Sequence, residues 1–184
     1  MASVPTSPLV PVEEYLNTSY EHDVEYVDGV LVERSLPTPA HGLLQSLIAG
    51  HLLRFRRQYN YAVCTECRVE LVERSRYRIP DVLLCSVPVK ATDKALKSVP
   101  LAVIEIWSPE DRMPRQMARF EEYWNRGVRQ IIVLDPEEFT AFRYENRALA
   151  QCEIEDLELP NGGKVPFSSK ELLNELKEEL DRQS

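Results

Sequence analysis

Three short apolar segments limit the folds that this chain can adopt. Residues 79–85, 101–107 and 131–134 are rich in Val, Ile and Leu and are too short for buried helices, so they read as buried strands. Residues 113–124, between the second and third segments, carry apolar side chains at helical spacing, and Gly127 follows as a C-terminal stop. Strands that alternate with helices predict a mixed-sheet α/β domain.

The N-terminal part carries a strong β-hairpin pattern. Residues 24–27 and 30–33 are strand-like, and Asp28-Gly29 separates them. A two-residue hairpin turn needs positive φ angles, which Gly adopts freely and Asp tolerates. We therefore expect an N-terminal hairpin that precedes the main sheet.

The length of 184 residues suits one domain with short extensions. We expect residues 1–11 to form a flexible lead-in and residues 12–184 to form a single domain. The chain has no apolar run near the ~20 residues of a membrane-spanning helix, and its N-terminus lacks the basic and apolar regions of a secretory signal. We expect no membrane association.

The cysteines are too few and too scattered for a disulfide scaffold, so we expect a reduced, cytoplasmic protein. Cys64 and Cys67 form a lone CxxC, whereas a structural zinc site needs four ligands. Cys85 and Cys152 are single and distant in the sequence. We expect thiols that carry neither a metal nor a disulfide.

The net charge of -8 argues against bulk electrostatic affinity for nucleic acid. The charge is unevenly distributed, however: residues 1–40 sum to -6, residues 41–130 to +5 and residues 131–184 to -7. The basic middle part contains the candidate chemistry described next. Either it contacts a polyanion, or surface charges cluster there by chance.

Two carboxylates occur where an ionised group is costly. Glu105 lies between Ile104 and Ile106, and Asp81 precedes the apolar residues 82–84. A buried carboxylate needs a compensating partner, and two on adjacent strands repel unless a cation lies between them. Mg²⁺ or Mn²⁺ would serve, because hard divalent ions prefer oxygen ligands. The alternative is that each carboxylate pairs with an arginine or a backbone amide.

The spacing of Asp81 and Glu105 resembles the core of PD-(D/E)XK nucleases, and the flanking segments sharpen this resemblance. The ordered set over roughly residues 10 to 175 resembles the bacterial Uma-two family of restriction-endonuclease-like proteins. The segments that carry it are Glu25-Tyr26-Val27-Asp28-Gly29, Pro37 to His41, Ile79-Pro80-Asp81-Val82, Ile104-Glu105-Ile106-Trp107-Ser108-Pro109, Glu122-Tyr123, Gly127-Val128 and Val133-Leu134-Asp135-Pro136.

The resemblance implies a restriction-endonuclease-like core, with a mixed four- to five-stranded sheet flanked by helices. It also implies that Asp81 and Glu105 bind Mg²⁺ or Mn²⁺. Glu25 matches a further acidic position that faces the same site, although it also fits a surface charge on the hairpin. His41 matches a family position before the long helix, where it could cap the helix or contact phosphate.

Two departures from the family pattern concern the active-site cation. Trp107 stands at the third position of the (D/E)XK motif, where lysine is expected. Members of the family carry the lysine on the following helix, and Arg119 occupies that position here. Arg74, Arg76 and Arg78 alternate before Asp81, so they are candidates for contacts with backbone phosphates.

The resemblance implies a Mg²⁺-dependent DNA endonuclease, weakened by the replacement of lysine with Arg119. Catalysis would involve Asp81, Glu105, Arg119 and Glu25, with metal bound by the three carboxylates. A homodimer is expected, because two sites are needed to cut two strands. One alternative is an inactive nuclease-fold protein that serves as a binding or oligomerisation module, and another is a small-molecule or metal-binding α/β domain.

Overall fold

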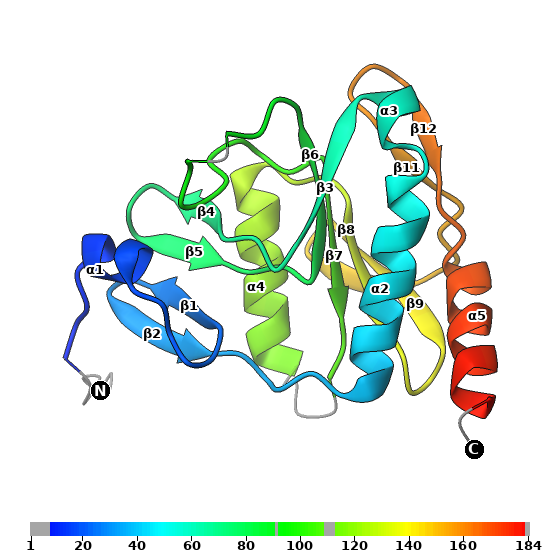
Figure 1. Cartoon of the computed structure of the whole chain (residues 1–184), viewed down its shortest axis with the longest axis horizontal. Helices are drawn as coiled ribbons and strands as arrows, with labels where there is room; N and C mark the ends of the chain where they lie inside the picture. The colour runs from blue at the N-terminus through cyan, green and yellow to red at the C-terminus, as the bar shows by residue number, and fades with distance from the viewer. Residues whose placement is uncertain (1–7, 91, 109–112, 183–184) are drawn as a thin grey trace.

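The computed structural model describes residues 8–90, 92–108 and 113–182. A six-stranded mixed sheet runs through its centre, in the order β10-β9-β8-β7-β6-β3 (Figure 1). β7 and β8 are parallel, whereas the other neighbours are antiparallel. The strands are β3 (Tyr61–Thr65), β6 (Val82–Ser86), β7 (Ala102–Ile106), β8 (Ile131–Asp135), β9 (Thr140–Glu145) and β10 (Ala148–Gln151).

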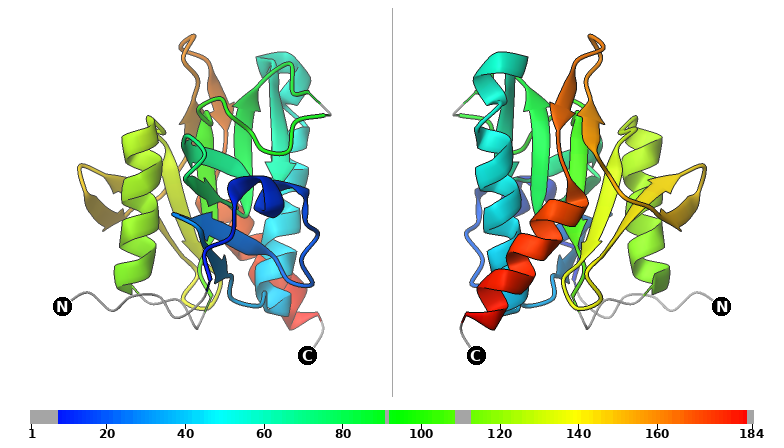
Figure 2. Two further views of the ribbon diagram at one scale, coloured as in Figure 1. Left: turned by 90° about the vertical axis from the view of Figure 1, so that its left-hand side faces the viewer. Right: turned by 90° about the vertical axis from the view of Figure 1, so that its right-hand side faces the viewer.

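Helices cover both faces of this sheet (Figure 2). α2 (Pro39–Leu53) and α5 (Ser169–Asp181) lie on one face, and α4 (Met113–Arg126) lies on the other. Successive side chains along β7 point to opposite faces of the sheet. Ile104 and Ile106 belong to the core under α2 and α5, and Val103 belongs to the core under α4. The side chain of Glu105 therefore points to the α4 face.

Helix caps in the sequence set the starts of the two helices on the first face. The hydroxyl of Thr38 accepts a hydrogen bond from the backbone N–H of His41 at 3.2 Å, and Pro39 occupies the first turn of α2. The hydroxyl of Ser168 accepts one from the N–H of Glu171 at 3.2 Å. α3 (Arg56–Tyr59) follows α2, and the small hairpin of β11 (Asp156–Glu158) and β12 (Lys164–Pro166) precedes α5 (Figure 1).

A second, four-stranded antiparallel sheet packs beside the first, in the order β2-β1-β5-β4. Its turn at Asp28 and Gly29 has φ angles of 51° and 90°, which confirms the predicted hairpin. Its small core contains the buried tyrosines Tyr15, Tyr26 and Tyr77 together with Val12, Val24 and Ala95. The elements are α1 (Val12–Asn17), β1 (Val24–Val27), β2 (Val30–Glu33), β4 (Val69–Val72) and β5 (Arg76–Arg78).

The predicted α/β class with a mixed sheet flanked by helices is confirmed, and the central sheet extends to six strands. Of the predicted lead-in, residues 1–7 lie outside the described residues. Residues 8–11 lie against the hairpin, because the N–H of Val10 donates to the carbonyl of Gly29 at 2.8 Å and the Tyr26 hydroxyl donates to the carbonyl of Val10 at 2.8 Å. Within the described part of the chain, no helix has the length and apolar character needed to cross a membrane.

Candidate active site

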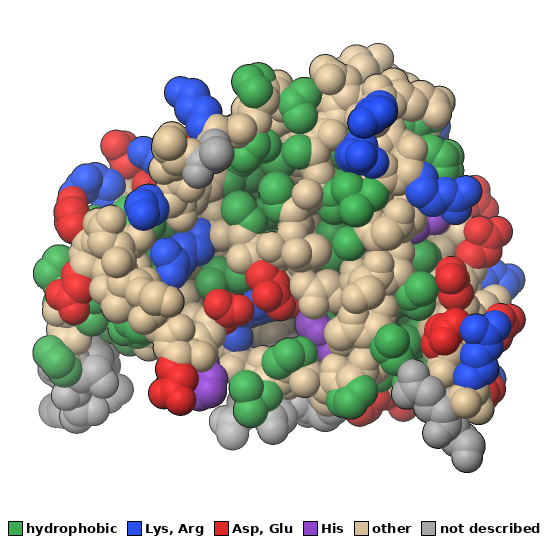
Figure 3. All heavy atoms as spheres, in the orientation of Figure 1, with side chains coloured by type: hydrophobic (Ala, Val, Ile, Leu, Met, Phe, Trp, Pro, Cys, Tyr) green, Lys and Arg blue, Asp and Glu red, His purple; other side chains and the backbone are tan. Residues whose placement is uncertain are grey.

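Asp81 and Glu105 lie opposite each other at the end of the β6–β7 pair. Val82 pairs with Ile104 in the antiparallel register, so the next facing positions are Asp81 and Glu105. Facing residues in such a pair point to the same side of a sheet. Both line one pocket of about 280 Å³, and Figure 3 shows acidic, basic and histidine side chains around a hollow on this face of the molecule.

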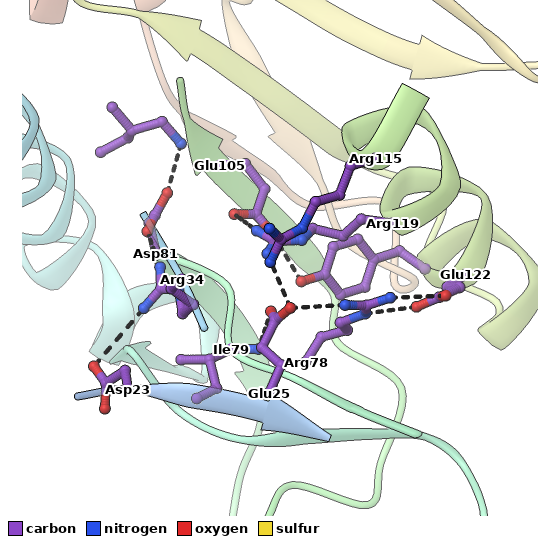
Figure 4. A network of polar contacts seen from close by, with 12 residues as sticks. Asp23, Glu25, Arg34, Arg78, Ile79, Asp81, Glu105, Arg115, Arg119 and Glu122 are labelled. Atoms are coloured by element: carbon purple, nitrogen blue, oxygen red, sulfur yellow. Dashed lines mark hydrogen bonds and ion pairs between the residues drawn. The ribbon is translucent and has the colours of Figure 1, made fainter. Parts of the chain in front are cut away.

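The carboxylate of Asp81 is almost fully buried and is held from three sides. The N–H of Ile106 donates to its Oδ2 at 2.7 Å, Nε2 of His41 lies 3.4 Å from the same oxygen, and the Arg34 guanidinium pairs with Oδ1 (Figure 4). Burial by itself raises the pKa of Asp81, but the contacts with His41 and Arg34 lower it below its ordinary value. Asp81 is therefore an anion in the folded protein at neutral pH.

For Glu105, in contrast to Asp81, the effect of burial on the pKa outweighs that of the favourable contacts. The Tyr123 hydroxyl donates to its Oε1 at 2.7 Å, and Nη1 of Arg119 donates to Oε2 at 3.3 Å. Burial raises the pKa of Glu105 to about 7, and the nearby charge of Asp81 adds to this effect, while Arg119 opposes it. Two facing carboxylates with pKa values pushed apart are typical of functional sites.

Glu25 is fully buried behind this pair and is not a surface charge of the hairpin. Nη1 of Arg78 and Nη2 of Arg119 donate to its Oε2 at 2.7 and 3.0 Å, and the N–H of Ile79 donates to Oε1 at 3.1 Å. Although burial raises the pKa of Glu25, the two arginines lower it below its ordinary value. Glu25 thus holds Nη2 of Arg119, while Nη1 of the same guanidinium donates to Glu105 (Figure 4).

This arrangement corrects the prediction of a metal site built from three carboxylates. Among residues 8–90, 92–108 and 113–182, no group of three or more His, Cys, Asp or Glu side chains is placed to hold a metal. Glu25 does not line the pocket, and three N–H donors already bind its oxygens. Of the three predicted metal ligands, Asp81 and Glu105 line the pocket together, and the predicted residues Arg119 and His41 line it with them.

The three arginines predicted to contact phosphate lie outside the pocket lining. Arg78 is buried and forms a two-fold ion pair with Glu122, at 2.6 and 2.9 Å, besides its contact with Glu25. Arg76 also contacts Glu122, at 3.2 Å. Arg74 lies in the turn before β5 with a φ of 55°, so it does not share a strand face with the others. Their partners are carboxylates, which corrects the expectation of a shared phosphate-binding face.

Two arginines that the sequence did not single out line the pocket instead. Arg34 follows β2 and reaches Asp81, and Arg115, in the first turn of α4, donates to the carbonyl of Glu33 at 2.6 Å. Neither lies in a periodic pattern or beside a predicted site residue, so no local signal marks them. Only the approach of the hairpin to α4 places them at the pocket.

The described cysteines are all free thiols, and three of them lie together. Cys64 on β3 and Cys85 on β6 lie in neighbouring strands, with Ala62 opposite Cys85, so Cys85 is distant from the CxxC in the sequence but close to it in space. Hydrogen bonds from the thiols of Cys67 and Cys85 lower the pKa of the Cys64 thiol. The predicted absence of metal and disulfide stays a prediction.

Comparisons with known proteins relate the chain and its fold to a protein family. One solved structure, described as the crystal structure of a putative nuclease belonging to DUF820 from Anabaena variabilis ATCC 29413, superposes with a TM-score of 0.73. The two are 20% identical over 91% of this chain and 99% of that chain, so the likeness concerns the fold alone. No curated protein matches the chain. The family model described as "Uma2: Putative restriction endonuclease" matches residues 12–174. The chain therefore belongs to the Uma2 family of restriction-endonuclease-like proteins.

Proposed function

We propose that the protein is a DNA endonuclease that depends on a divalent metal ion, Mg²⁺ or Mn²⁺, bound by Asp81 and Glu105. The observation that carries the proposal is the pair of buried, facing carboxylates in one pocket of a nuclease-family fold. Burial of two carboxylates side by side is costly, and a cation between them relieves that cost.

The donor set fits a Mg²⁺ ion better than an ion that needs a cage of protein ligands. Mg²⁺ is often bound by only one or two carboxylates and keeps water and substrate phosphate as its other ligands. Asp81 and Glu105 supply two such carboxylates at the pocket. When bound, the ion would lower the pKa of a water molecule and stabilise negative charge on the phosphate.

Arg119 supplies a fixed positive charge beside these carboxylates. It is 6% exposed, lines the pocket, and is clamped between Glu25 and Glu105. An arginine stays protonated, so it can stabilise charge on a phosphate but cannot accept a proton as a base. Trp107 supplies no cation, because an indole is neutral, and its ring packs on Phe142 with centroids 4.9 Å apart. The reaction is therefore expected to be slow.

His41 is a further pocket residue whose ring would have to turn from Asp81 to contact a phosphate oxygen. Its Nε2 faces Asp81 at 3.4 Å, while its Nδ1 is buried and lacks a hydrogen-bond partner among the described residues. With Arg34 and Arg115 it adds donors to the pocket wall. These groups replace the predicted face of three arginines as the proposed contacts with the DNA backbone. Action on DNA and free thiols both fit a cytoplasmic protein.

The test is nicking of supercoiled plasmid by purified protein with Mg²⁺ or Mn²⁺. We expect slow, metal-dependent nicking that Asp81→Asn abolishes and that Asp93→Asn, an exposed loop control, leaves unchanged. Conversion to linear plasmid in a single binding event would support the proposed homodimer, because one site cuts one strand. Equal nicking by wild type and Asp81→Asn would refute the assignment.

A second function has a specific observation in its favour. Both carboxylates of the pocket already have arginine partners, and the family lysine is absent. Such a site could persist in an inactive protein that binds DNA or another copy of itself. Metal binding and DNA binding without any strand cleavage would favour this second function.

A further inference from the structure

We propose that Arg34 is a displaceable counter-ion of Asp81 that a divalent metal must compete with to enter the pocket. This inference rests on the proposed metal site and assigns a regulatory role to a residue outside it. Arg34 lies directly after β2, and its side chain is 14% exposed at the pocket wall. It pairs with Asp81 in the described structure.

The competition follows from which oxygen of Asp81 each partner occupies. Oδ2 accepts the N–H of Ile106 at 2.7 Å and faces Nε2 of His41 at 3.4 Å. Oδ1 is the oxygen that Arg34 contacts. A metal ion that binds Asp81 through its less occupied oxygen therefore meets the guanidinium at the same position. Two cations cannot share that position without strong repulsion.

Arg34 also has a second acceptor, to which it can move. Its Nη1 lies 3.9 Å from Oδ2 of Asp23, a side chain that is 58% exposed and lines the same pocket. Figure 4 shows Arg34 between the two aspartates. A rotation of the long arginine side chain toward Asp23 would free Oδ1 and keep the guanidinium paired. Asp23 therefore stabilises the displaced position.

Arg119, in contrast to Arg34, cannot leave its carboxylate partners at low cost. Both of its carboxylate partners, Glu25 and Glu105, are buried, and the arginine itself is 6% exposed. Its release would leave two buried carboxylates with less compensation, which is strongly unfavourable. Release of Arg34 leaves Asp81 with His41, the Ile106 amide and the entering metal. The displaceable arginine of the site is thus Arg34.

The test measures Mn²⁺ affinity by calorimetry on full-length protein, so that cleavage is not the readout. Arg34→Gln should bind Mn²⁺ about tenfold more tightly, because it removes one nearby positive charge whose repulsion of the ion is partly screened by water. Asp23→Asn should bind it more weakly, because the displaced guanidinium loses its acceptor. Arg74→Gln, which breaks a surface pair with Glu13, is the matched control and should not change the affinity.

The outcomes separate this inference from the proposed function. If wild type binds Mn²⁺, Asp81→Asn does not, and Arg34→Gln binds equally or less tightly than wild type, the role of Arg34 is refuted and the metal site stands. If no variant binds Mn²⁺, both fail. If Arg34→Gln does not fold, Asp23→Asn decides by comparison with Glu21→Gln, which removes one negative charge from the same pocket lining. A greater loss of Mn²⁺ affinity in Asp23→Asn than in Glu21→Gln supports the inference, and an equal or smaller loss refutes it.

Discussion

The replacement of Glu105 by glutamine tests the electrostatics of the site without any assumption about substrate. Glutamine keeps the shape of the side chain and an oxygen that accepts from Tyr123, but it cannot titrate. In the folded protein the pKa of Glu105 is about 7, because burial raises it from its ordinary value of 4.5. The folded state therefore holds a proton between pH 4.5 and 7 that the unfolded state releases.

The direction and size of the effect follow from this difference. The proton-linked contribution of Glu105 is fully present below pH 4.5 and is lost as the pH rises through 7. A difference between 4.5 and about 7 corresponds to about 3 kcal/mol, since one pKa unit corresponds to about 1.4 kcal/mol. The free energy of unfolding of the wild type should fall by that amount relative to Glu105→Gln across this range.

Urea unfolding at several pH values between about 4.5 and 8 measures the difference between wild type and variant. Glu153→Gln is the control, because Glu153 forms an exposed surface pair with Lys170. Parallel stability profiles for wild type and Glu105→Gln would refute the raised pKa and, with it, the argument that burial of Glu105 outweighs its contact with Arg119. Metal binding to Glu105 should also release a proton near neutral pH, which calorimetry in buffers of different ionisation enthalpy detects.

Three further predictions concern the cations and thiols. Arg119→Lys should nick plasmid faster than wild type, by up to ~10²-fold, because an ammonium can position a water molecule; slower nicking would contradict this. Arg78→Leu should lower the free energy of unfolding by about 3 kcal/mol in urea, because buried Glu25 and Glu122 each lose one of their two arginine partners, and a smaller loss in a Glu122→Gln background would confirm the pairing. Cys64 should react with iodoacetamide before Cys152 near neutral pH, since its pKa is lowered by thiol donors; mass spectrometry of the labelled peptides reads the order.

Much of the fold was predictable, because it depends on patterns within short stretches of chain. Alternation and apolar content locate β6, β7 and β8, and the Asp28-Gly29 pair fixes the turn of the first hairpin. A lone carboxylate within an apolar strand is costly wherever the strand lies, so the sequence alone makes Asp81 and Glu105 stand out. Their identity as the centre of the candidate site is therefore a property of the sequence.

The partners of those carboxylates depend on tertiary structure. Glu25 and Arg34 come from the N-terminal hairpin and Arg119 comes from α4, far along the chain. They meet only because the hairpin lies against both the start of β6, where Arg34 contacts Asp81, and α4, where Arg119 contacts Glu25. No local pattern encodes which arginine reaches which acid, since long side chains select partners by the distances that packing leaves. The same reason explains why Arg78 became a buried support of Glu25 and not a surface contact for phosphate. The sequence determined where negative charge is buried, and the packing of distant elements decided which positive charges compensate for it.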